Sequence, residues 1–437
     1  MSWIAPLSIM LGLVMAMMAI GMPVAFAFLT ANIVGVILYM GGEAGLHQLI
    51  LNMSRSISAF YLVPVPLFVL MGELFFHTGV SKRVFHAIDR LFGRVPGRLC
   101  YISVAGGSLF ASLSGSSIAN TAMLGSMLVP DMEARGYDKR FAMGPIMATG
   151  GLAVLIPPSA LAVLLGSLAK IDIGALLIAG VLPGLLLALM FVVYIYIRVR
   201  LNPALAPQYA VEPASTGEKV RLVITNLLPT GVIIFCVIGL IILGIATPTE
   251  SAAFGVLGVL IVAAAFRLLT FQTLYRSLKA SLKVSTMLLA ILLASLTFSQ
   301  VMAFSGATAG LIEMTGSLNL GPLPMLLIMF AVLLFLGMFI DQTSQMMLTI
   351  PIFIPLAQSL GFDPVWFGLI VLLALEMSTM TPPFGLLLFV MVGAAPKGTT
   401  IGDVARAAFP YLVIDLILLA LLIAFPQIAL FLPGLMV

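Results

Sequence analysis

The feature that most constrains this chain is an internal repeat with a constant offset of 225 residues. Four prolines and one glycine of the first half recur at that offset: Pro23 as Pro248, Pro130 as Pro355, Pro157 as Pro382, Pro158 as Pro383 and Gly136 as Gly361. Matches of this kind at one fixed spacing indicate a duplicated unit. In an apolar chain, Pro/Gly breaks at matching places in two halves are typical of secondary transporters, whose sites lie where broken helices meet.

Composition places the chain in a membrane. Hydrophobic residues make up 62% and charged residues 8% of it, against about 25% charged residues in soluble domains. The mean hydropathy is +1.23. With only three histidines and two cysteines among 437 residues, a disulfide framework or a zinc site is not expected. The apolar run at residues 4–20 lacks a basic segment before it, so it is interpreted as a first span rather than a signal peptide.

Hydropathy predicts two kinds of apolar segment. Membrane spans are expected at residues 4–20, 23–40, 57–79, 141–169, 173–198, 222–244, 251–267, 284–303, 366–394 and 407–425. Two further stretches, 98–130 and 323–355, are interrupted near the middle by polar residues. We interpret these two as re-entrant helical hairpins, which enter and leave the membrane on the same side.

The basic residues support this topology. With both hairpins re-entrant, 18 of the 20 Lys and Arg residues fall on one face, and only Arg55 and Lys170 fall on the other. The positive-inside rule makes the rich face cytoplasmic and both termini periplasmic. The predicted fold is an all-α polytopic membrane protein with a first repeat (1–201), a cytoplasmic linker (202–221) and a second repeat (222–437). Each repeat has five spans and one hairpin, so the second copy is inverted, as in alternating-access transporters.

Two amphipathic stretches, 81–95 and 267–283, place apolar residues opposite Lys and Arg. Interfacial helices along the cytoplasmic membrane surface are one interpretation. Ordinary amphipathic connectors are the other, and the sequence leaves both open.

The polar break of the first hairpin can hold charged ligands. Ser114, Gly115, Ser116 and Ser117 form a run in which glycine allows a sharp turn and serines present oxygens. The helix that follows points its free N–H groups at the turn, which favours an anion there and a hard cation among the oxygens. Asn120 is a further oxygen donor. The alternative is that these small residues only permit close helix packing.

The second hairpin carries an acid at the matching place. By the repeat offset, Asp341 occupies the position of Ser116, and Gln342 that of Ser117. An aspartate at membrane depth costs about 2.5–3.5 kcal/mol, so it needs a partner or a ligand. Thr343 and Ser344 offer further oxygens. Protonation of Asp341, or a structural contact with the other repeat, remains an alternative.

Paired prolines interrupt the fourth span of each repeat, in IPPSA (156–160) and TPPFG (381–385). They remove two N–H donors, which frees the carbonyls of Ala153 and Val154 in one repeat and of Ser378 and Thr379 in the other. Neighbouring groups or a cation must satisfy such carbonyls in the membrane. A hairpin turn opposite a broken helix in each half therefore predicts two similar cation sites around a two-fold axis. The alternative is a kink that only shapes packing.

Three other acids lie within predicted spans. Structural roles are expected for Glu73, near a cytoplasmic helix end, and for Asp415, paired with a neighbouring helix. The sequence leaves the role of Glu376, just before the TPP break, undecided.

Ordered motifs along nearly the whole chain carry a family resemblance. They are GMPVAFA (21–27), PVPLFVLMGEL (64–74), FASLSGSSIANTAMLG (110–125), VPDMEARGYDKRFA (129–142), IPPSA, PGLLLAL (183–189), GMFIDQTSQMMLTIPIFIPLAQSLGFDPVWFG (337–368) and EMSTMTPPFGLLLF (376–389). At these motifs the chain resembles the large membrane subunit of a TRAP (tripartite ATP-independent periplasmic) transporter. The resemblance implies a secondary transporter of the bacterial inner membrane, not an enzyme, driven by a sodium gradient through an elevator-like movement. It also implies two partners, a small four-helix membrane subunit and a periplasmic substrate-binding protein, and C4-dicarboxylates or other organic carboxylates as substrates.

The resemblance also implies site residues. One Na⁺ site corresponds to Ser114, Gly115, Ser116, Ser117, Asn120 and Ile156, and the other to Asp341, Gln342, Thr343, Ser344 and Thr381. The substrate is expected between the two hairpin turns, at Ser116, Ser117, Gln342 and Thr343. The chain departs from the family pattern at residues 378–380, just before TPP.

Three other functions are alternatives. A stand-alone sodium–carboxylate symporter shares the same plan and differs in needing no binding protein. An intramembrane serine protease needs a base beside its nucleophile, but the histidines (His47, His77 and His86) lie outside the hairpins and no lysine is expected at membrane depth. A passive channel would line a continuous path with polar groups instead of gathering them at two turns. The sequence contains no nucleotide-binding loop, so transport driven by ATP is not expected.

Overall fold

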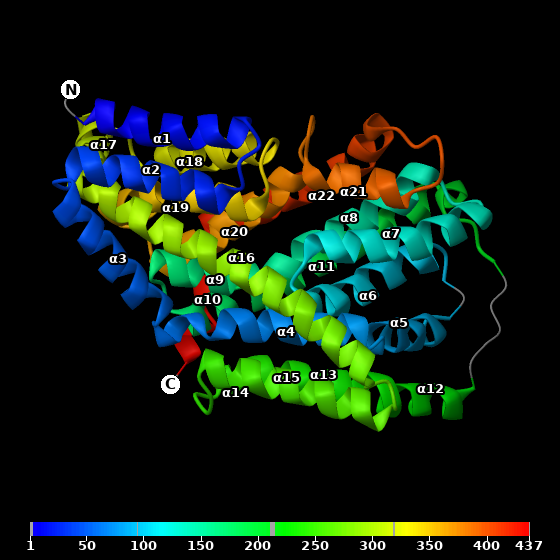
Figure 1. Cartoon of the computed structure of the whole chain (residues 1–437). Coiled ribbons are helices and arrows are strands. Elements are labelled where there is room, and N and C mark those ends of the chain that lie inside the picture. The colour runs from blue at the N-terminus through cyan, green and yellow to red at the C-terminus, as the bar shows by residue number, and fades with distance from the viewer. Residues whose placement is uncertain (1–2, 94, 210–214, 318–319, 437) are drawn as a thin grey trace.

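The computed structural model describes residues 3–93, 95–209, 215–317 and 320–436, without the side chains of residues 61 and 112–114. Throughout this described part the regular structure is helical (Figure 1). The helices of the first half are α1 (Ile4–Ala19), α2 (Val24–Tyr39), α3 (Glu43–Ile57), α4 (Pro64–His77), α5 (Val80–Leu91), α6 (Arg98–Ser114), α7 (Ser117–Ala134), α8 (Lys139–Leu155), α9 (Ala160–Ala169), α10 (Ile173–Ala179) and α11 (Val181–Leu201).

The second half begins with one long, uneven helix. It consists of α12 (Thr216–Leu222), α13 (Leu228–Ile234) and α14 (Leu240–Ile242), separated by π-helical turns. The others are α15 (Pro248–Ala265), α16 (Phe271–Phe304), α17 (Ala307–Ser317), α18 (Pro322–Gly337), α19 (Gln342–Ser359), α20 (Pro364–Met380), α21 (Leu386–Ala394), α22 (Ile401–Ala424) and α23 (Gln427–Leu430).

Local structure recurs at the sequence offset. Asp138 caps α8 by accepting from the backbone N–H of Phe141 at 2.9 Å, and Asp363 caps α20 by accepting from that of Trp366 at 2.9 Å. Both Pro–Pro bonds of the two breaks are cis. Gly136 and Gly361 both adopt positive φ, +78° and +77°, a conformation that suits glycine. Equal spacing in the sequence therefore corresponds to equal local geometry.

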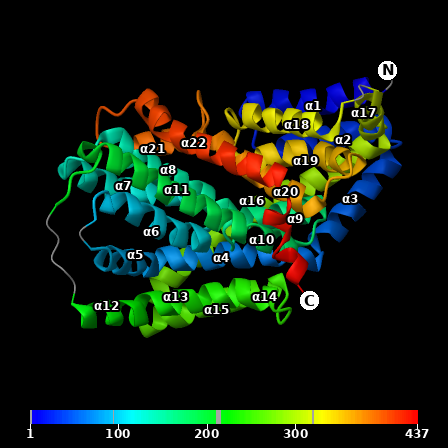
Figure 2. The same ribbon diagram turned by 180° about the vertical axis from the view of Figure 1, so that it is seen from behind.

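The centre of the molecule combines elements of both halves. The first hairpin, α6 and α7, packs on α8, and the second hairpin, α18 and α19, packs on α20. α7 also packs against α21, α19 packs against α9, and α8 packs against α20. Figures 1 and 2 show α6 and α7 at the end of the bundle that holds α5 and α12, and α18 and α19 at the end that holds α1 and α17. The two hairpins thus approach the centre from opposite ends.

Apolar helices of spanning length agree with a polytopic membrane protein. Within the described residues, five helices are long and apolar enough to cross a membrane, and two bent pairs bring the number to seven. The bent pairs are α4 with α5, at 64°, and α8 with α9, at 41°. The second bend falls at the predicted IPPSA break. Five more apolar helices are shorter, and they include α6 and α18 of the hairpins.

Some predicted boundaries were wrong, and one helix was not predicted. The predicted stretch 267–283 and the predicted span 284–303 are not separate, because Phe271–Phe304 form one continuous helix, α16, of 34 residues. Its lysines interrupt the hydropathy, but a helix tolerates lysine in its interior. The span expected from 222 begins at Thr216, where Ser215 caps α12. An unexpected amphipathic helix, α3, occupies Glu43–Ile57.

Candidate functional site

The first turn joins α6 to α7. Gly115 has φ +60°, and a Cβ added there would lie 3.2 Å from the backbone nitrogen of Ala160. Ser116 is extended, and its hydroxyl oxygen accepts from the N–H of Ala119 at 3.2 Å, which caps α7. Glycine therefore allows this turn to rest against the start of α9, directly after the first proline break. Ser114 ends α6, and its side chain lies outside the described part of the structure.

The second turn, residues 338–341, joins α18 to α19. The Asp341 carboxylate accepts from the N–H groups of Thr343 at 3.0 Å and Ser344 at 3.1 Å, and also from the Ser344 hydroxyl. Asp341 thus caps α19 as its repeat equivalent Ser116 caps α7. The rings of Phe339 and Phe384 lie 5.7 Å apart, so this turn lies beside the second proline break.

Both hairpins line a single cavity of about 230 Å³. All four residues predicted to bind substrate contribute to its wall: Ser116, Ser117, Gln342 and Thr343. Two helices outside the hairpins supply the opposite wall, with Val69 and Glu73 from α4 and Val284, Met287 and Leu288 from α16. The starts of α7 and α19 therefore face the same cavity.

Glu376, whose role the sequence left undecided, connects the two hairpins. The Ser117 hydroxyl donates to Oε2 of Glu376 at 2.7 Å, and the Gln342 amide donates to the same oxygen at 2.6 Å. The side chain is buried, with 1% of the residue exposed. One carboxyl group on α20 therefore joins the start of α7 to the start of α19.

The surrounding contacts follow the repeat. The Ser117 hydroxyl also lies 3.1 Å from the carbonyl oxygen of Gly150, and the Gln342 amide lies 3.4 Å from that of Leu375. Gly150 and Leu375 are equivalent at the 225-residue offset. The equivalent of Glu376 is Gly151, where an added Cβ would lie 3.4 Å from the Glu376 side chain. The absence of a side chain in one repeat thus leaves room for the carboxyl group of the other.

The other residues predicted for the first cation site, Asn120 and Ile156, lie outside this cavity wall. Asn120 is fully buried, and its amide donates to the Thr149 hydroxyl at 3.0 Å. Ile156 follows α8 in an extended conformation, and its N–H donates to the carbonyl of Leu152 at 2.8 Å. Neither residue is part of the wall of the 230 Å³ cavity.

At the second break the predicted set of free carbonyls needs a correction. The N–H of Thr381 donates to the Ser378 carbonyl at 3.2 Å. The Thr381 hydroxyl donates to the Met377 carbonyl at 2.7 Å. The chain at Thr381 turns back on the helix end, so the Ser378 oxygen already has a partner before any cation binds.

A larger cavity, of about 780 Å³, lies on the other side of the second turn. Asp341, Thr343 and Ser344 form one wall, and the opposite wall comes from the start of α2 and the middle of α16, including Lys283. The sequence placed Lys283 in a cytoplasmic segment because the charge interrupts the hydropathy. The continuity of α16 instead brings this lysine to a wall that it shares with Asp341.

The other two acids within predicted spans, Glu73 and Asp415, lie in different surroundings. Glu73 lines the 230 Å³ cavity, and one of its carboxylate oxygens lies 3.2 Å from Nε2 of His77. Asp415 on α22 is 2% exposed, and neither of its carboxyl oxygens has a hydrogen-bond partner in the described part of the chain. The expected pairing of Asp415 with a neighbouring helix is therefore not found there.

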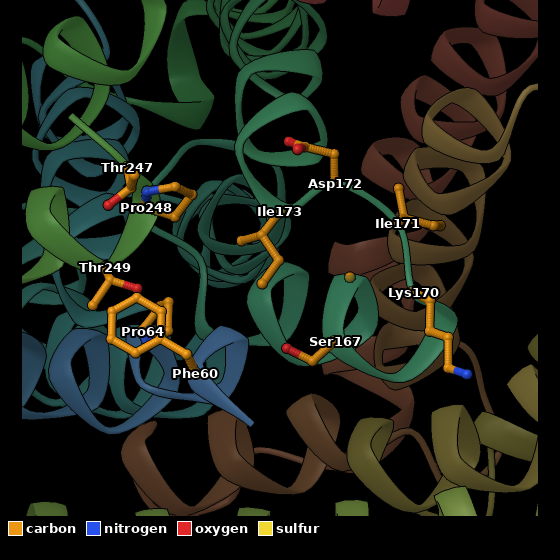
Figure 3. Close-up of a pocket in the computed structure, with 11 residues that line it drawn as sticks. Phe60, Pro64, Ser167, Lys170, Ile171, Asp172, Ile173, Thr247, Pro248 and Thr249 are labelled. Atoms are coloured by element: carbon orange, nitrogen blue, oxygen red, sulfur yellow. The ribbon is translucent and has the colours of Figure 1, made fainter. Parts of the chain in front are cut away.

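A third cavity, of about 610 Å³, contains none of the predicted site residues. It lies between the start of α4, the connection from α9 to α10 and the start of α15. Figure 3 shows the Lys170 ammonium group pointing away from Asp172 and from the two threonines of the wall. Asp172 caps α10 by accepting from the N–H of Ala175 at 2.7 Å. The charged groups of this cavity do not converge on one point.

The structure combines apolar helices of spanning length with two opposed hairpins and a cavity that both hairpins line. These features define a helical, multi-pass membrane transporter. The model of the tripartite ATP-independent periplasmic transporter DctM component matches residues 11–428. The chain therefore belongs to this family, as the motifs predicted, and it is a transporter permease of a bacterial TRAP system rather than an enzyme.

Individual relatives are similar to this chain over nearly its whole length. The sialic acid TRAP transporter large permease protein SiaM of Vibrio cholerae is 33% identical over 95% of this chain and 95% of its own length. The ectoine TRAP transporter large permease protein TeaC of Halomonas elongata is 31% identical over 97% of this chain and 98% of its own. In structure, the YdaH transporter of Alcanivorax borkumensis superposes with a TM-score of 0.65 over 89% of this chain and 90% of its own, at 14% identity. That likeness shows a shared fold.

Proposed function

We propose that this chain is the large transport subunit of a sodium-driven TRAP transporter that imports an organic carboxylate delivered by a periplasmic binding protein. The observation that carries the proposal is the cavity shared by both hairpin turns, joined through Glu376. The second proposed partner of this chain is a small four-helix membrane subunit. The proposed location of the complex is the bacterial inner membrane.

The substrate position follows from the helix ends. Both α7 and α19 begin at the 230 Å³ cavity, and each begins with residues that line it, Ser117 in one and Gln342 in the other. A helix N-terminus carries about half a positive charge and free N–H groups, which favour an anion. Sialic acid and ectoine, named for two relatives, both contain a carboxylate. The shared chemistry supports an organic acid as the substrate of this chain.

Sodium is proposed as the coupling ion. The turns place oxygen-bearing side chains beside the proline breaks, with Ser116 in the first turn and Asp341 in the second. Oxygen ligands of this kind suit a hard cation. Each Na⁺ that moves inward gains about 2.3 kcal/mol per 100 mV and about 1.4 kcal/mol per tenfold gradient. Two such ions would drive a carboxylate inward against a large concentration ratio.

The proposed movement is elevator-like, with two inverted repeats. Hairpins and broken helices pack on one another as one unit, whereas α4 and α16 supply the facing wall of the cavity. Sliding this unit along that wall would expose the cavity first to one side and then to the other. Figure 1 supports periplasmic termini, because the N- and C-terminal ends both lie toward the end of the bundle opposite α12.

The second candidate is a stand-alone sodium–carboxylate symporter, and one experiment separates the two. The chain and its small subunit are reconstituted in proteoliposomes, and uptake of labelled sialic acid, ectoine and succinate is measured under an imposed Na⁺ gradient, with and without the binding protein. Uptake that needs both sodium and the binding protein supports the proposal. Uptake without the binding protein favours the symporter, and uptake indifferent to sodium contradicts the cation sites.

A further inference from the structure

A further cavity, of about 570 Å³, lies away from both hairpin turns. Three parts of the chain line it: the residues at the start of α6, the last two turns of α11, and residues 203–208, which follow α11. The distribution of Lys and Arg assigns this end of α11 to the predicted cytoplasmic face. The cavity therefore lies at the level where the headgroups of that leaflet are expected.

The wall of this cavity carries one positive charge. Among its described residues Arg200, in the last turn of α11, is the only charged one, and it is exposed. Arg98 pairs with Asp89 and Arg135 pairs with Asp131, both at 2.9 Å. Arg200, by contrast, forms no ion pair within the part of the chain that the structure describes. Because a guanidinium group presents its donors as a fork that matches phosphate oxygens, Arg200 favours a phosphate group in the cavity.

Two tyrosines add neutral polar groups to the same wall. Tyr196 lies one turn before Arg200 on α11 and is 56% exposed, and Tyr101 lies on α6. Neither hydroxyl has a hydrogen-bond partner among the described residues. Tyrosine is enriched where a membrane meets water, because its ring is apolar and its hydroxyl is polar. The wall therefore suits a molecule that is polar at one end and apolar at the other.

An exposed apolar stripe leads from the cavity along α11. It consists of residues three or four positions apart, each between 46% and 57% exposed: Leu185, Leu189, Val193 and Tyr196. Residues at this spacing lie on one face of a helix. At about 1.5 Å per residue the stripe is about 16 Å long, which is about half of a hydrocarbon core of ~30 Å. The stripe therefore has the length of the acyl chains of one leaflet.

We propose that this cavity binds the headgroup of an anionic phospholipid, with the phosphate at Arg200 and an acyl chain along the stripe of α11. A free phosphate ion would use Arg200 alone, whereas a phospholipid also uses the apolar surface that continues from the cavity. Since residues 203–208 form part of the wall, the bound lipid also holds the start of the linker against α6 and α11. The site is separate from the substrate cavity, so the proposal does not depend on which substrate or ion is transported.

The first test measures binding. The purified full-length chain is titrated with palmitoyl-oleoyl phosphatidylglycerol, or with phosphatidylcholine of the same chains, and bound lipid is counted by native mass spectrometry. Arg200→Gln is compared with Arg198→Gln, a matched control because Arg198 is exposed on the same helix and lies outside the cavity wall.

We expect Arg200→Gln to weaken phosphatidylglycerol binding about fivefold, the effect of one basic residue near a membrane surface. Arg198→Gln should leave the affinity unchanged, and the wild type should prefer phosphatidylglycerol to phosphatidylcholine. Equal losses in the two variants, or equal affinity of the wild type for the two lipids, would overturn the proposal.

The second test locates the lipid in a bilayer. Val193→Trp places a fluorescent reporter on the stripe, and the protein is reconstituted in phosphatidylcholine vesicles that contain phosphatidylglycerol with brominated acyl chains, since bromine quenches tryptophan on contact. The signal of the protein without this substitution is subtracted, because Trp3 and Trp366 also fluoresce. We expect stronger quenching by brominated phosphatidylglycerol than by brominated phosphatidylcholine. Adding Arg200→Gln should abolish this preference, and adding Arg198→Gln should preserve it.

Two outcomes of the bilayer test identify other occupants. Relief of the quenching by inorganic phosphate would indicate a site for the free ion. Absence of quenching by either lipid in the complex with the small membrane subunit would indicate that protein covers the stripe. Either result would overturn the phospholipid site.

Discussion

Asp341 has two separable roles in the structure, and the repeat supplies the substitution that separates them. The carboxylate caps α19 through the N–H groups of Thr343 and Ser344, and it is also the proposed anionic ligand of the second Na⁺ site. Its equivalent in the first repeat, Ser116, caps α7 with a neutral hydroxyl. Asp341→Ser therefore keeps the type of cap and removes the charge.

The two roles of Asp341 contribute different free energies, one to folding and one to sodium binding. Serine and aspartate are similar N-caps, so Asp341→Ser changes stability by a few tenths of a kcal/mol, whereas Asp341→Ala costs about 1 kcal/mol. A carboxylate 4 Å from a cation contributes about 1 kcal/mol in water and about 4 kcal/mol in a partly buried site. Asp341 is exposed at the cavity wall. We therefore expect loss of its charge to weaken sodium binding by at least about 1.4 kcal/mol, which is a tenfold change in sodium affinity.

The assay is substrate uptake in proteoliposomes as a function of Na⁺ concentration, with the thermal midpoint of each variant measured in parallel. Asp341→Ser should keep the wild-type midpoint and need at least ten times more sodium for half-maximal uptake. Asp341→Ala should lower both the midpoint and the sodium affinity. A serine variant with wild-type sodium dependence would refute the second cation site, since its cap and its fold are intact.

Two further predictions concern packing and charge. In Gly337→Ala, the added Cβ would lie 2.0 Å from the hydroxyl oxygen of Ser378, and such overpacking costs about 1–3 kcal/mol. The control is Gly12→Ala, whose added Cβ meets nothing within 4 Å and should stabilise the helix by about 0.5–1 kcal/mol. Gly337→Ala should therefore lower the thermal midpoint and Gly12→Ala should raise it. Midpoints of the two variants that move in the same direction would contradict the described packing. We expect the ammonium group of Lys283 to attract an anionic substrate, so Lys283→Met should raise the KM for a carboxylate about tenfold. The control is Lys279→Met, one turn away and outside the cavity wall, which should leave the KM unchanged.

Much of the local geometry of the two turns and breaks was predictable because its determinants are local. The glycine of the first turn, the capping residues Ser116 and Asp341, and the two Pro–Pro breaks act through backbone geometry within a few residues. Such effects depend on residue type and spacing, which the sequence displays directly. The repeat then indicated which turn corresponds to which, and the structure places the four predicted substrate residues around one cavity.

Helix boundaries were less predictable where hydropathy and helix propensity disagree. Lys279 and Lys283 lower the hydropathy of α16 without ending the helix, since lysine is a good helix former. The amphipathic α3 was missed for a related reason, because its polar face lowers its mean hydropathy. Only packing shows that Lys283, at the end of the predicted amphipathic stretch 267–283, belongs to a cavity wall.

By itself, the sequence determined the class of protein, the duplication and the places where the chain must bend, because composition, spacing and the conformational limits of proline and glycine act locally. Tertiary structure alone decided the contacts of Glu376, which bonds to Ser117 across 259 positions of sequence and lies against Gly151, its equivalent in the other repeat. The physical reason is that the repeat is matched in backbone but not in side chains. Where two equivalent helices meet, there is room for one carboxyl group, and which partners it binds depends on how the helices pack.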